Sequence, residues 1–324
     1  MATIIVTGVD GFVGTHLAAA ASSGGHRVVG ITRDPPLPEV IAPFVDEHHV
    51  ADLRVEWPRG ISGDVIIHLA GLAAVGPSFA EPQRYISANS AMVTTMCEQV
   101  LGLPRRDRPR IVVVSSGAVY AAPAPGARVT EDSPMAFSSP YVVSKVLVEN
   151  QLAYYRARGL DTLVVRPFNH IGPGQSPGFL VPDLYESLQS ADASRPLVAG
   201  NLGTRRDYTD VRDVVRAYLL LATSPDHSSD VYNIASGVAT SGREILALLT
   251  AELGRPTPSV RVHPDRVRAD DPDIIVGAAD RLEAEFGWVP RWSVAESVAD
   301  FVRAVSGNGS PVGSGDRGTG HHGS

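Results

Sequence analysis

Short apolar runs alternate with amphipathic stretches through the first half of the chain. The runs are rich in β-branched residues and are apolar on both faces, which is typical of strands in a parallel sheet covered by helices on both sides. The predicted strands are Thr3–Thr7, Arg27–Thr32, Asp64–Leu69, Arg110–Ser116 and Thr162–Pro167. The predicted helices are Phe12–Ser22, Arg84–Leu103 and Pro140–Arg158. This order predicts an α/β fold built on a doubly wound parallel sheet with right-handed crossovers.

The pattern is less regular after Pro167. It predicts helices at Val211–Ala222, Arg243–Leu253 and Ala295–Val305, and a strand at Val231–Ala235 that returns to the sheet. A chain of 324 residues favours two lobes over one. We expect a sheet lobe of residues 1–168 plus 211–236 and a smaller α/β lobe of residues 169–210 plus 237–306. The Gly- and Ser-rich residues 307–324 are predicted to be a disordered tail.

Composition and charge exclude several classes of protein. The net charge is −7 and there is no basic block, which argues against a nucleic-acid partner. No apolar run approaches the roughly 18 residues of a transmembrane helix, and the first twelve residues predict a strand and a turn rather than a signal peptide. A single cysteine, Cys97, predicts a cytoplasmic chain without an internal disulfide. The histidines show no zinc-like spacing, so no metal site is expected.

A glycine-rich turn joins the first strand to the first helix. Its sequence, TGVDGFVG, places glycines at 8, 11 and 14, with Phe12 and Val13 at the start of the helix. Gly8 permits a tight turn, Gly11 allows close approach of a pyrophosphate, and Gly14 allows the helix to pack against the strand. The free N–H groups of the helix N-terminus favour an anion. The turn therefore predicts a Rossmann-type dinucleotide-binding domain, with the smaller lobe left to bind substrate.

The end of the second strand bears on the choice between NAD(H) and NADP(H). Thr32 ends this strand and Arg33 follows, and a cation there suits a 2′-phosphate, which favours NADP(H). The competing interpretation gives Asp34 the role of the acid that holds the ribose 2′-hydroxyl in NAD(H) sites. Asp52 and Leu53 are candidates to frame the adenine.

Three residues form the candidate catalytic group. Ser116 ends an apolar strand, at the edge where parallel sheets bind ligands. Tyr141 and Lys145 lie four residues apart on a predicted helix, and hence on one face. A nearby ammonium and an oxidised nicotinamide both favour the phenolate of Tyr141, which makes it a candidate acid or base. Lys145 can also bind the nicotinamide ribose, and Ser116 the substrate oxygen, with Ser115 as the neighbouring candidate.

Taken together, these motifs resemble the extended short-chain dehydrogenase/reductase family of nucleotide-sugar epimerases, dehydratases and reductases. The resemblance extends from about residue 3 to 305 through the segments TGVDGFVG, HLAG (68–71), SSGAVY (115–120), SPYVVSK (139–145), RPFNHIGPGQ (166–175), RRDYTDVRDVVRAY (205–218) and YNIASG (232–237). The RPFNHIGPGQ and RDYTDVRDV segments look most like GDP-4-keto-6-deoxy-D-mannose reductases.

The resemblance implies further site residues. Leu69, Ala70 and Gly71 would contact the cofactor, and the nucleotide-diphosphate sugar would meet Ser78, Asn169, Arg206 and Arg268. It also implies a homodimer packed through helices that include residues 141–158.

One departure from the family pattern affects the predicted reaction. Dehydratases of this family carry acids just after the catalytic Ser or Thr, whereas this chain has Gly117 and Ala118. Reductases often carry an acid near position 118 too. We therefore expect NAD(P)H-dependent reduction of a nucleotide-diphosphate-4-keto-6-deoxyhexose at carbon 4. The alternatives are a 4-epimerase that retains NAD, a dehydratase, and a catalytically silent dinucleotide sensor.

Overall fold

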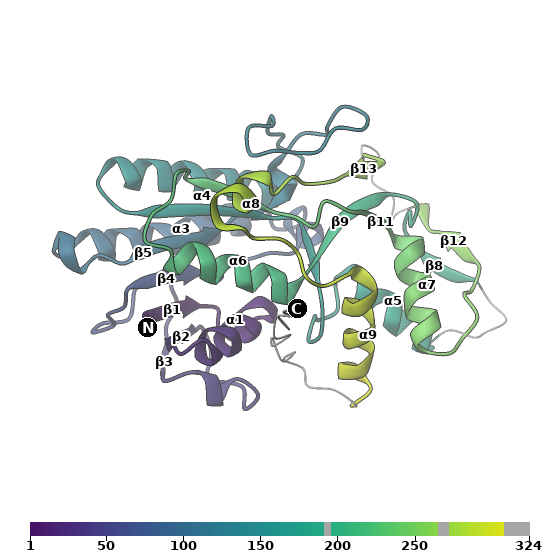
Figure 1. Ribbon diagram of the computed structural model, residues 1–324, viewed down its shortest axis with the longest axis horizontal. Helices are drawn as coiled ribbons and strands as arrows, with labels where there is room; N and C mark the ends of the chain where they lie inside the picture. Colours follow the sequence, from purple (N-terminus) through teal and green to yellow (C-terminus); the bar gives the residue numbers. More distant parts are fainter. Residues whose placement is uncertain (191–195, 265–271, 308–324) are drawn as a thin grey trace, which may run out of the picture.

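The larger lobe is built on a seven-stranded, fully parallel sheet. A computed structural model describes residues 1–190, 196–264 and 272–307. Across the sheet the strand order is β10-β6-β5-β4-β1-β2-β3. The part from β5 to β3 is labelled in Figure 1. The strands are β1 (Thr3–Thr7), β2 (Arg27–Thr32), β3 (Glu47–Val50), β4 (Val65–His68), β5 (Arg110–Val114), β6 (Thr162–Pro167) and β10 (Val231–Ile234). The predicted doubly wound parallel sheet is confirmed.

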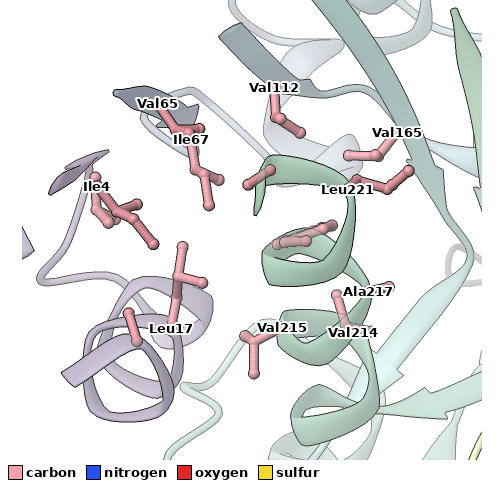
Figure 2. Packing of buried hydrophobic residues seen from close by; sticks show 14 of the residues in the cluster. Ile4, Leu17, Val65, Ile67, Val112, Val165, Val214, Val215, Ala217 and Leu221 are labelled. Atoms are coloured by element: carbon pink, nitrogen blue, oxygen red, sulfur yellow. The ribbon is translucent and has the colours of Figure 1, made fainter. Parts of the chain in front are cut away.

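Alternate residues of each strand pack on opposite faces of this sheet. On one face, Ile4 and Val6 of β1 and Val65 and Ile67 of β4 meet Leu17 and the apolar stripe of α6 (Figure 2). The helices that cover this face are α1 (Phe12–Ser23) and α6 (Val211–Thr223). Burial on both faces explains why the strands are continuously apolar in the sequence.

The opposite face is covered by α3 (Pro82–Leu101) and α4 (Pro140–Ala157). Ile5 of β1 and Ile66 of β4 point to this side and pack with Met96 and Cys97 of α3 and Leu152 of α4. This packing anchors α4, the helix that carries Tyr141 and Lys145. Among the described helices, none combines the length and apolar character that crossing a membrane requires.

The strand order places the ligand-binding edge. β1 lies between β2 and β4, so the chain winds outward in one direction and then in the other. In such sheets a crevice opens at the carboxyl ends of the strands where the winding reverses. The segments that follow β1, β4, β5 and β6 meet at this edge, and all of them carry predicted site residues.

The smaller lobe combines short strands with three longer helices. Its core joins residues of α5 (Leu180–Ser190), α7 (Gly242–Glu252) and α9 (Val294–Val305). Its strands are β7 (Asn169–Ile171), β8 (Leu197–Ala199), β9 (Arg205–Asp210), β11 (Ala239–Ser241), β12 (Val260–Val262) and β13 (Ile274–Ile275). β9 pairs with β7, β11 and β13, and β8 pairs with β12.

The chain crosses between the lobes more often than expected. β10 pairs with β6 in the large sheet. Beyond residue 237, however, α8 (Asp280–Phe286) contacts β10, and its Leu282 lies with Trp288 in the core formed by α1 and α6. Residues 280–288 thus pack on the larger lobe, whereas the sequence analysis assigned them to the smaller one. The reason is that the apolar side chains of Leu282 and Trp288 are fully buried in the core of the larger lobe. The predicted tail lies outside the described residues except for Gly307.

The remaining structural elements had weak sequence signals. β3 (Glu47–Val50) has the sequence EHHV and forms the exposed edge of the sheet, so it lacks an apolar run. The strands of the smaller lobe outside β9 are only two or three residues long. The other short elements are the helix α2 (Val75–Ser78) and the 3₁₀ helices Ala42–Phe44, Arg105–Asp107 and Gly117–Val119. Such segments are too short for a periodicity to be recognised.

Candidate active site

The glycine turn after β1 has the close contacts that its sequence predicts. Gly8 has a φ of 67°, in the left-handed region that favours glycine, and its N–H donates to the Ile31 carbonyl at 2.8 Å. A Cβ added at Gly14 would lie 2.2 Å from the Gly8 carbonyl oxygen. The helix can therefore approach the strand only if residue 14 has no side chain.

The N-terminus of α1 fits a bound anion. Gly11 occupies the N-cap position, and no side chain among the described residues caps the helix there. The first turn, which contains Phe12 and Val13, carries no acidic residue. Its N–H groups and the positive end of the helix dipole are thus suited to a pyrophosphate. The dinucleotide cofactor of this fold would be held here.

The loop that follows β6 packs against this turn. The His170 ring stacks on Phe12, with ring centroids 5.9 Å apart and planes inclined by 17°. His16, one turn further along α1, forms a 2.8 Å hydrogen bond between its Nε2 and the Pro173 carbonyl. Burial lowers the pKa of both imidazoles, so they are neutral at physiological pH. The sequence analysis did not assign roles to His16 or His170.

Charged side chains gather where β2 and β3 end. Arg33 Nε lies 2.8 Å from Asp34 Oδ2, and both side chains are well exposed. Asp52 pairs with Arg54, which together with the nearby Arg33 lowers the pKa of Asp52 to about 2. Arg33 and Arg54 are thus each paired with an acid, so the structure does not choose between Arg33 and Asp34 as the residue that meets an adenosine ribose.

Leu53 has a different setting from its neighbours. Its side chain is buried with Ile31 and Trp57 in the core on the sheet face that α3 and α4 cover. Only the backbone of this residue can therefore frame an adenine.

The segment after β4 is fixed from β1. Thr7 Oγ1 is hydrogen-bonded to His68 Nδ1 at 2.8 Å and accepts the Ala70 N–H at 3.1 Å. Ala70 in turn lies against Gly8, where an added Cβ would be 3.0 Å from the Ala70 nitrogen. Leu69 packs at the rim of the core formed by α1 and α6. The predicted cofactor segments 8–14 and 69–71 thus adjoin.

Gly71 lies between this segment and the helices α3 and α4. A Cβ at Gly71 would lie 3.3 Å from Asn89 Oδ1 and 3.9 Å from Lys145 Nζ. Asn89, which sequence reasoning missed, is buried on α3. It accepts the Leu72 N–H at 2.9 Å and donates to Ser144 Oγ at 2.9 Å. The signal available in the sequence was a polar asparagine on a helix face whose other residues are mostly apolar and buried.

The two serines after β5 have different partners. The Ser115 hydroxyl donates to the Glu149 carboxylate and is buried. Ser116 Oγ accepts the Ala118 N–H at 3.1 Å and is a hydrogen-bond partner of Tyr141 that lowers the pKa of that phenol. The contact with Tyr141 supports Ser116, rather than Ser115, as the serine that faces a substrate.

Tyr141 and Lys145 lie in the first two turns of α4. Burial raises the pKa of Tyr141 above its usual value despite the contact with Ser116, so the phenol is protonated at neutral pH. Lys145 Nζ lies 5.8 Å from the centroid of the Tyr141 ring and donates to the Val114 carbonyl at 2.7 Å. Burial lowers the pKa of Lys145 to about 8. The structure brings the predicted serine, tyrosine and lysine together at the end of β5.

The predicted substrate residues differ in how they are placed. Asn169 is exposed and donates to the Asp207 carbonyl at 3.2 Å. Arg206, on β9, is partly buried and donates to the Arg205 carbonyl at 2.7 Å. Ser78 is fully buried and donates to the Val75 carbonyl at 2.6 Å, so its side chain presents no surface to a ligand in this conformation. Arg268 lies outside the described residues.

Asp207, next to Arg206, joins three segments around the site. Its buried carboxylate accepts hydrogen bonds from Ser236 N and Oγ, from Gly237 N and from Gly277 N, at 2.7 to 3.2 Å. Burial raises its pKa, although these donors oppose the shift. The RRDYTD and YNIASG motifs are therefore linked by a structural carboxylate. In the described part of the chain, no group of three or more His, Cys, Asp or Glu side chains is placed to hold a metal ion.

The arrangement combines an anion cradle with a proton donor. A dinucleotide bound at α1 would extend along the sheet edge past residues 69–71 to Tyr141 and Lys145. A protonated phenol and a serine hydroxyl beside it can donate hydrogen bonds to one substrate oxygen. This geometry suits reversible oxidation and reduction at a carbon that bears that oxygen.

Comparisons with known proteins agree with this geometry. A model of the NAD dependent epimerase/dehydratase family matches residues 4–235. GDP-6-deoxy-D-mannose reductase of Pseudomonas aeruginosa is 31% identical over 301 residues, covering 91% of this chain and 94% of the relative. UDP-glucose 4-epimerase of Azospirillum brasilense is 27% identical over 345 residues, covering 97% of each chain.

A solved structure with the same fold is that of UDP-glucose 4-epimerase from Bifidobacterium longum in complex with NAD⁺ and UDP. It superposes with a TM-score of 0.81 at 22% identity, over 94% of this chain and 98% of that chain. This likeness establishes the shared fold.

Proposed function

Because the chain belongs to the NAD dependent epimerase/dehydratase family, we propose that it reduces a nucleotide-diphosphate-4-keto-6-deoxyhexose at carbon 4, using NAD(P)H. The chain is a nucleotide-sugar-modifying enzyme of the NAD(P)-dependent oxidoreductase type. The proposal rests chiefly on one observation: Ser116 and Lys145 both lie close to the protonated Tyr141. The 31% identity to GDP-6-deoxy-D-mannose reductase supports reduction as the reaction.

Each residue of the trio has a distinct task in this reaction. The nicotinamide, when bound, supplies the hydride to carbon 4 of the sugar. Tyr141 donates its phenolic proton to the oxygen on that carbon, and Ser116 donates a hydrogen bond that orients the same oxygen. The Lys145 ammonium stabilises the phenolate left after proton transfer.

The residues after Ser116 argue against a dehydratase. Elimination of water requires an acid or base near the carbon that loses the proton. A Cβ at Gly117 would lie 3.0 Å from the Phe168 ring, so that position has no room for a carboxylate side chain without displacing the ring. Ala118 is exposed and cannot exchange a proton.

The finer preference for NADP(H) rests on Arg33. We expect Arg33→Ala to raise the KM for NADPH about tenfold and to leave the KM for NADH nearly unchanged, because a hydrogen bond to a charged group is worth about 1.5–3 kcal/mol. Initial rates with both cofactors provide the measurement. An equal change in KM for both cofactors, or a wild-type preference for NADH, would contradict the NADP(H) preference. It would favour Asp34 as the residue that binds the ribose 2′-hydroxyl.

The nucleotide diphosphate sugar would lie between the lobes. Asn169 and Arg206 are the candidates to hold its phosphates and sugar, since both lie on strands that begin or end near Asp207. A contribution from Ser78 or Arg268 remains a proposal based on the family pattern.

Two further expectations concern the whole protein. We propose a homodimer that packs through α4, where Leu147 and Tyr154 are exposed and lie seven residues apart on one face. A cytoplasmic location is supported by the single cysteine, a buried free thiol.

The cofactor content of the purified protein tests the proposed reaction. Denatured protein is analysed for released nucleotide, and NADPH oxidation is followed with GDP-, UDP- and dTDP-linked 4-keto-6-deoxy sugars. We expect net consumption of reduced cofactor with one of these sugars. Tightly bound NAD⁺ in stoichiometric amount, without net NADPH oxidation, would instead identify a 4-epimerase like the relative from Azospirillum brasilense.

A further inference from the structure

Lys145 is the only lysine in the sequence, which has 28 Lys and Arg residues in total. Every other fixed cation of the chain is an arginine. A guanidinium remains charged at any pH that a protein tolerates, whereas an ammonium can lose its proton when it is buried. The protonation state of Lys145 therefore depends on its surroundings, and these include one neighbouring anion.

That anion is Glu149, one helical turn after Lys145 on α4. Its side chain is 8% exposed, and Arg166 on β6, 4% exposed, binds it through two parallel contacts. Arg166 Nη2 lies 2.6 Å from Glu149 Oε2, and Arg166 Nε lies 3.0 Å from Oε1. The Ser115 hydroxyl donates to the same carboxylate. A buried carboxylate with this many donors is held in one position.

Arg166 is itself fixed from two other elements. Its Nη1 donates to the Tyr120 hydroxyl at 2.8 Å, and the guanidinium lies 4.9 Å from the centroid of the Tyr120 ring. The Tyr120 hydroxyl donates to Asn233 Oδ1 on β10 at 2.6 Å. The position of the carboxylate is therefore set by the segment after β5 together with β6 and β10.

Lys145 and Glu149 both bind the end of β5. Lys145 Nζ donates to the carbonyl of Val114, and Glu149 accepts from the hydroxyl of the next residue, Ser115. Ser115 N also donates to the Val165 carbonyl at 2.8 Å. Ser116 directly follows this doubly held segment, so its orientation depends on the same two side chains.

The other ionisable groups around Lys145 do not supply a negative charge. His68 reaches it from β4, and burial together with the Lys145 charge lowers the pKa of His68 to about 3, so the imidazole is neutral. Tyr141 on α4 and Tyr85 on α3 are buried phenols with raised pKa values, and Arg166 is a cation. Among the described groups, Glu149 is the one whose charge favours the ammonium of Lys145.

We propose that Glu149 is a positioning residue for the catalytic trio: held by Arg166 and Ser115, its carboxylate lies one helical turn from Lys145 and anchors the β5 end from which Ser116 extends. The role of Lys145 in catalysis rests on the proposed function. The arrangement separates two tasks, because Arg166 fixes the carboxylate while Lys145 stays available to Tyr141 and the cofactor.

The direction of the pH effect follows from the charges. Burial lowers the pKa of Lys145 to about 8, and Glu149 opposes this shift. The ammonium is present below that pH and is lost as the pH rises through it. Removing the Glu149 charge lowers the pKa further, so the ammonium is lost at a lower pH.

A direct test follows the titration of Lys145 itself. Protein labelled with ε-¹³C-lysine contains one labelled side chain, and the pH dependence of its ¹³C shift is compared in wild type, Glu149→Gln, Glu149→Asp and Glu98→Gln. Glu98 is an exposed carboxylate on α3 paired with Arg158, and serves as the matched control. We expect a lower midpoint in Glu149→Gln, a smaller change in Glu149→Asp, and none in Glu98→Gln.

The rate profile gives the second readout. We expect kcat/KM of Glu149→Gln to fall about tenfold relative to wild type above pH 8 and to change much less near pH 6. Loss of a neighbouring opposite charge shifts a pKa by roughly one unit, and above the pKa each unit lowers the ammonium fraction about tenfold. A uniform loss at all pH values with an unmoved lysine titration would overturn the proposal. If Glu149→Gln does not fold, an unmoved titration in Glu149→Asp has the same meaning.

The two readouts also separate this proposal from the proposed reaction. Lysine titration needs no substrate. A shifted midpoint in a protein that reduces no keto-sugar would contradict the proposed function and leave the Glu149–Lys145 coupling in place.

Discussion

At the level of single residues, close backbone contacts and buried polar contacts define the site. Gly14 has a steric task that can be read from the turn motif, and the structure adds the atom that an added side chain would meet, the Gly8 carbonyl oxygen. Burial raises the pKa of Tyr141 and keeps it a proton donor, although the hydrogen bond to Ser116 opposes this shift. Two predictions belong to this scale.

Replacing Gly14 by alanine is expected to weaken both stability and cofactor binding. The new Cβ would lie 2.2 Å from backbone, and such overpacking costs about 1–3 kcal/mol. Gly76→Ala is the matched control, because its added Cβ would meet no atom within 4 Å outside its chain neighbours and its own helix turn. Thermal denaturation and titration with NADPH measure both effects. Equal melting temperatures for the two variants would contradict this account.

Replacing Tyr141 by phenylalanine removes the proton donor and little volume. We expect kcat to fall by about 10²–10⁴, the usual contribution of a positioned acid, with the Kd for NADPH nearly unchanged. Fluorescence titration and initial rates check the two quantities. A variant that retains most of its activity would remove Tyr141 from the catalytic role.

At the level of elements, the structure shows why some segments were predictable. The sheet strands β1, β2 and β6 begin and end at the residues predicted, because each is buried on both faces and bounded by turn residues. α4 begins where the sequence indicates, with Pro140 in its first turn and Ser139 as its N-cap. The short strands of the smaller lobe depend on pairing with distant partners and carry no such local signal.

Removing the N-cap of α4 is expected to affect catalysis as well as stability. Ser139 Oγ accepts the Val142 N–H at 3.2 Å, directly beside Tyr141. We expect Ser139→Ala to lose about 1 kcal/mol of stability and several-fold in kcat. Ser293→Ala removes the corresponding cap of α9 in the smaller lobe and should lose similar stability with an unchanged kcat. Similar kcat values in the two variants would show that the cap does not position Tyr141.

At the level of the whole molecule, residues from distant parts of the chain complete each lobe. β10 adds to the large sheet, Trp288 enters the core against α1 and α6, and Asp207 of β9 binds the loop after β10. Segments that are distant in the sequence thus complete the packing around each lobe. The proposed dimer adds a further level of assembly.

A charge on the exposed face of α4 should separate the dimer. We expect Leu147→Glu to sediment as a monomer, because a carboxylate cannot be buried unpaired in an apolar interface. Val55→Glu introduces the same charge at an exposed valine after β3 and should leave the dimer intact. Sedimentation velocity distinguishes the outcomes, and a monomeric wild type would refute the dimer itself.

The sequence by itself determined the large sheet and predicted the candidate cofactor turn and the candidate catalytic trio. These features depend on local patterns: apolar runs, glycines at fixed spacing, and a Tyr and Lys one turn apart on a helix. The choice of Ser116 over Ser115 was a matter of motif alignment until the structure showed that Ser115 donates to Glu149.

Only the tertiary structure decided which distant side chains act on these groups. Glu149 with Arg166, Asn89 with Gly71, and His170 with Phe12 come from separate strands, helices and loops. Their contacts form when the sheet order and helix packing bring the segments together, and no spacing along the chain encodes them. The protonation of Lys145 depends on burial and on the charge of Glu149, and both are products of the folded arrangement.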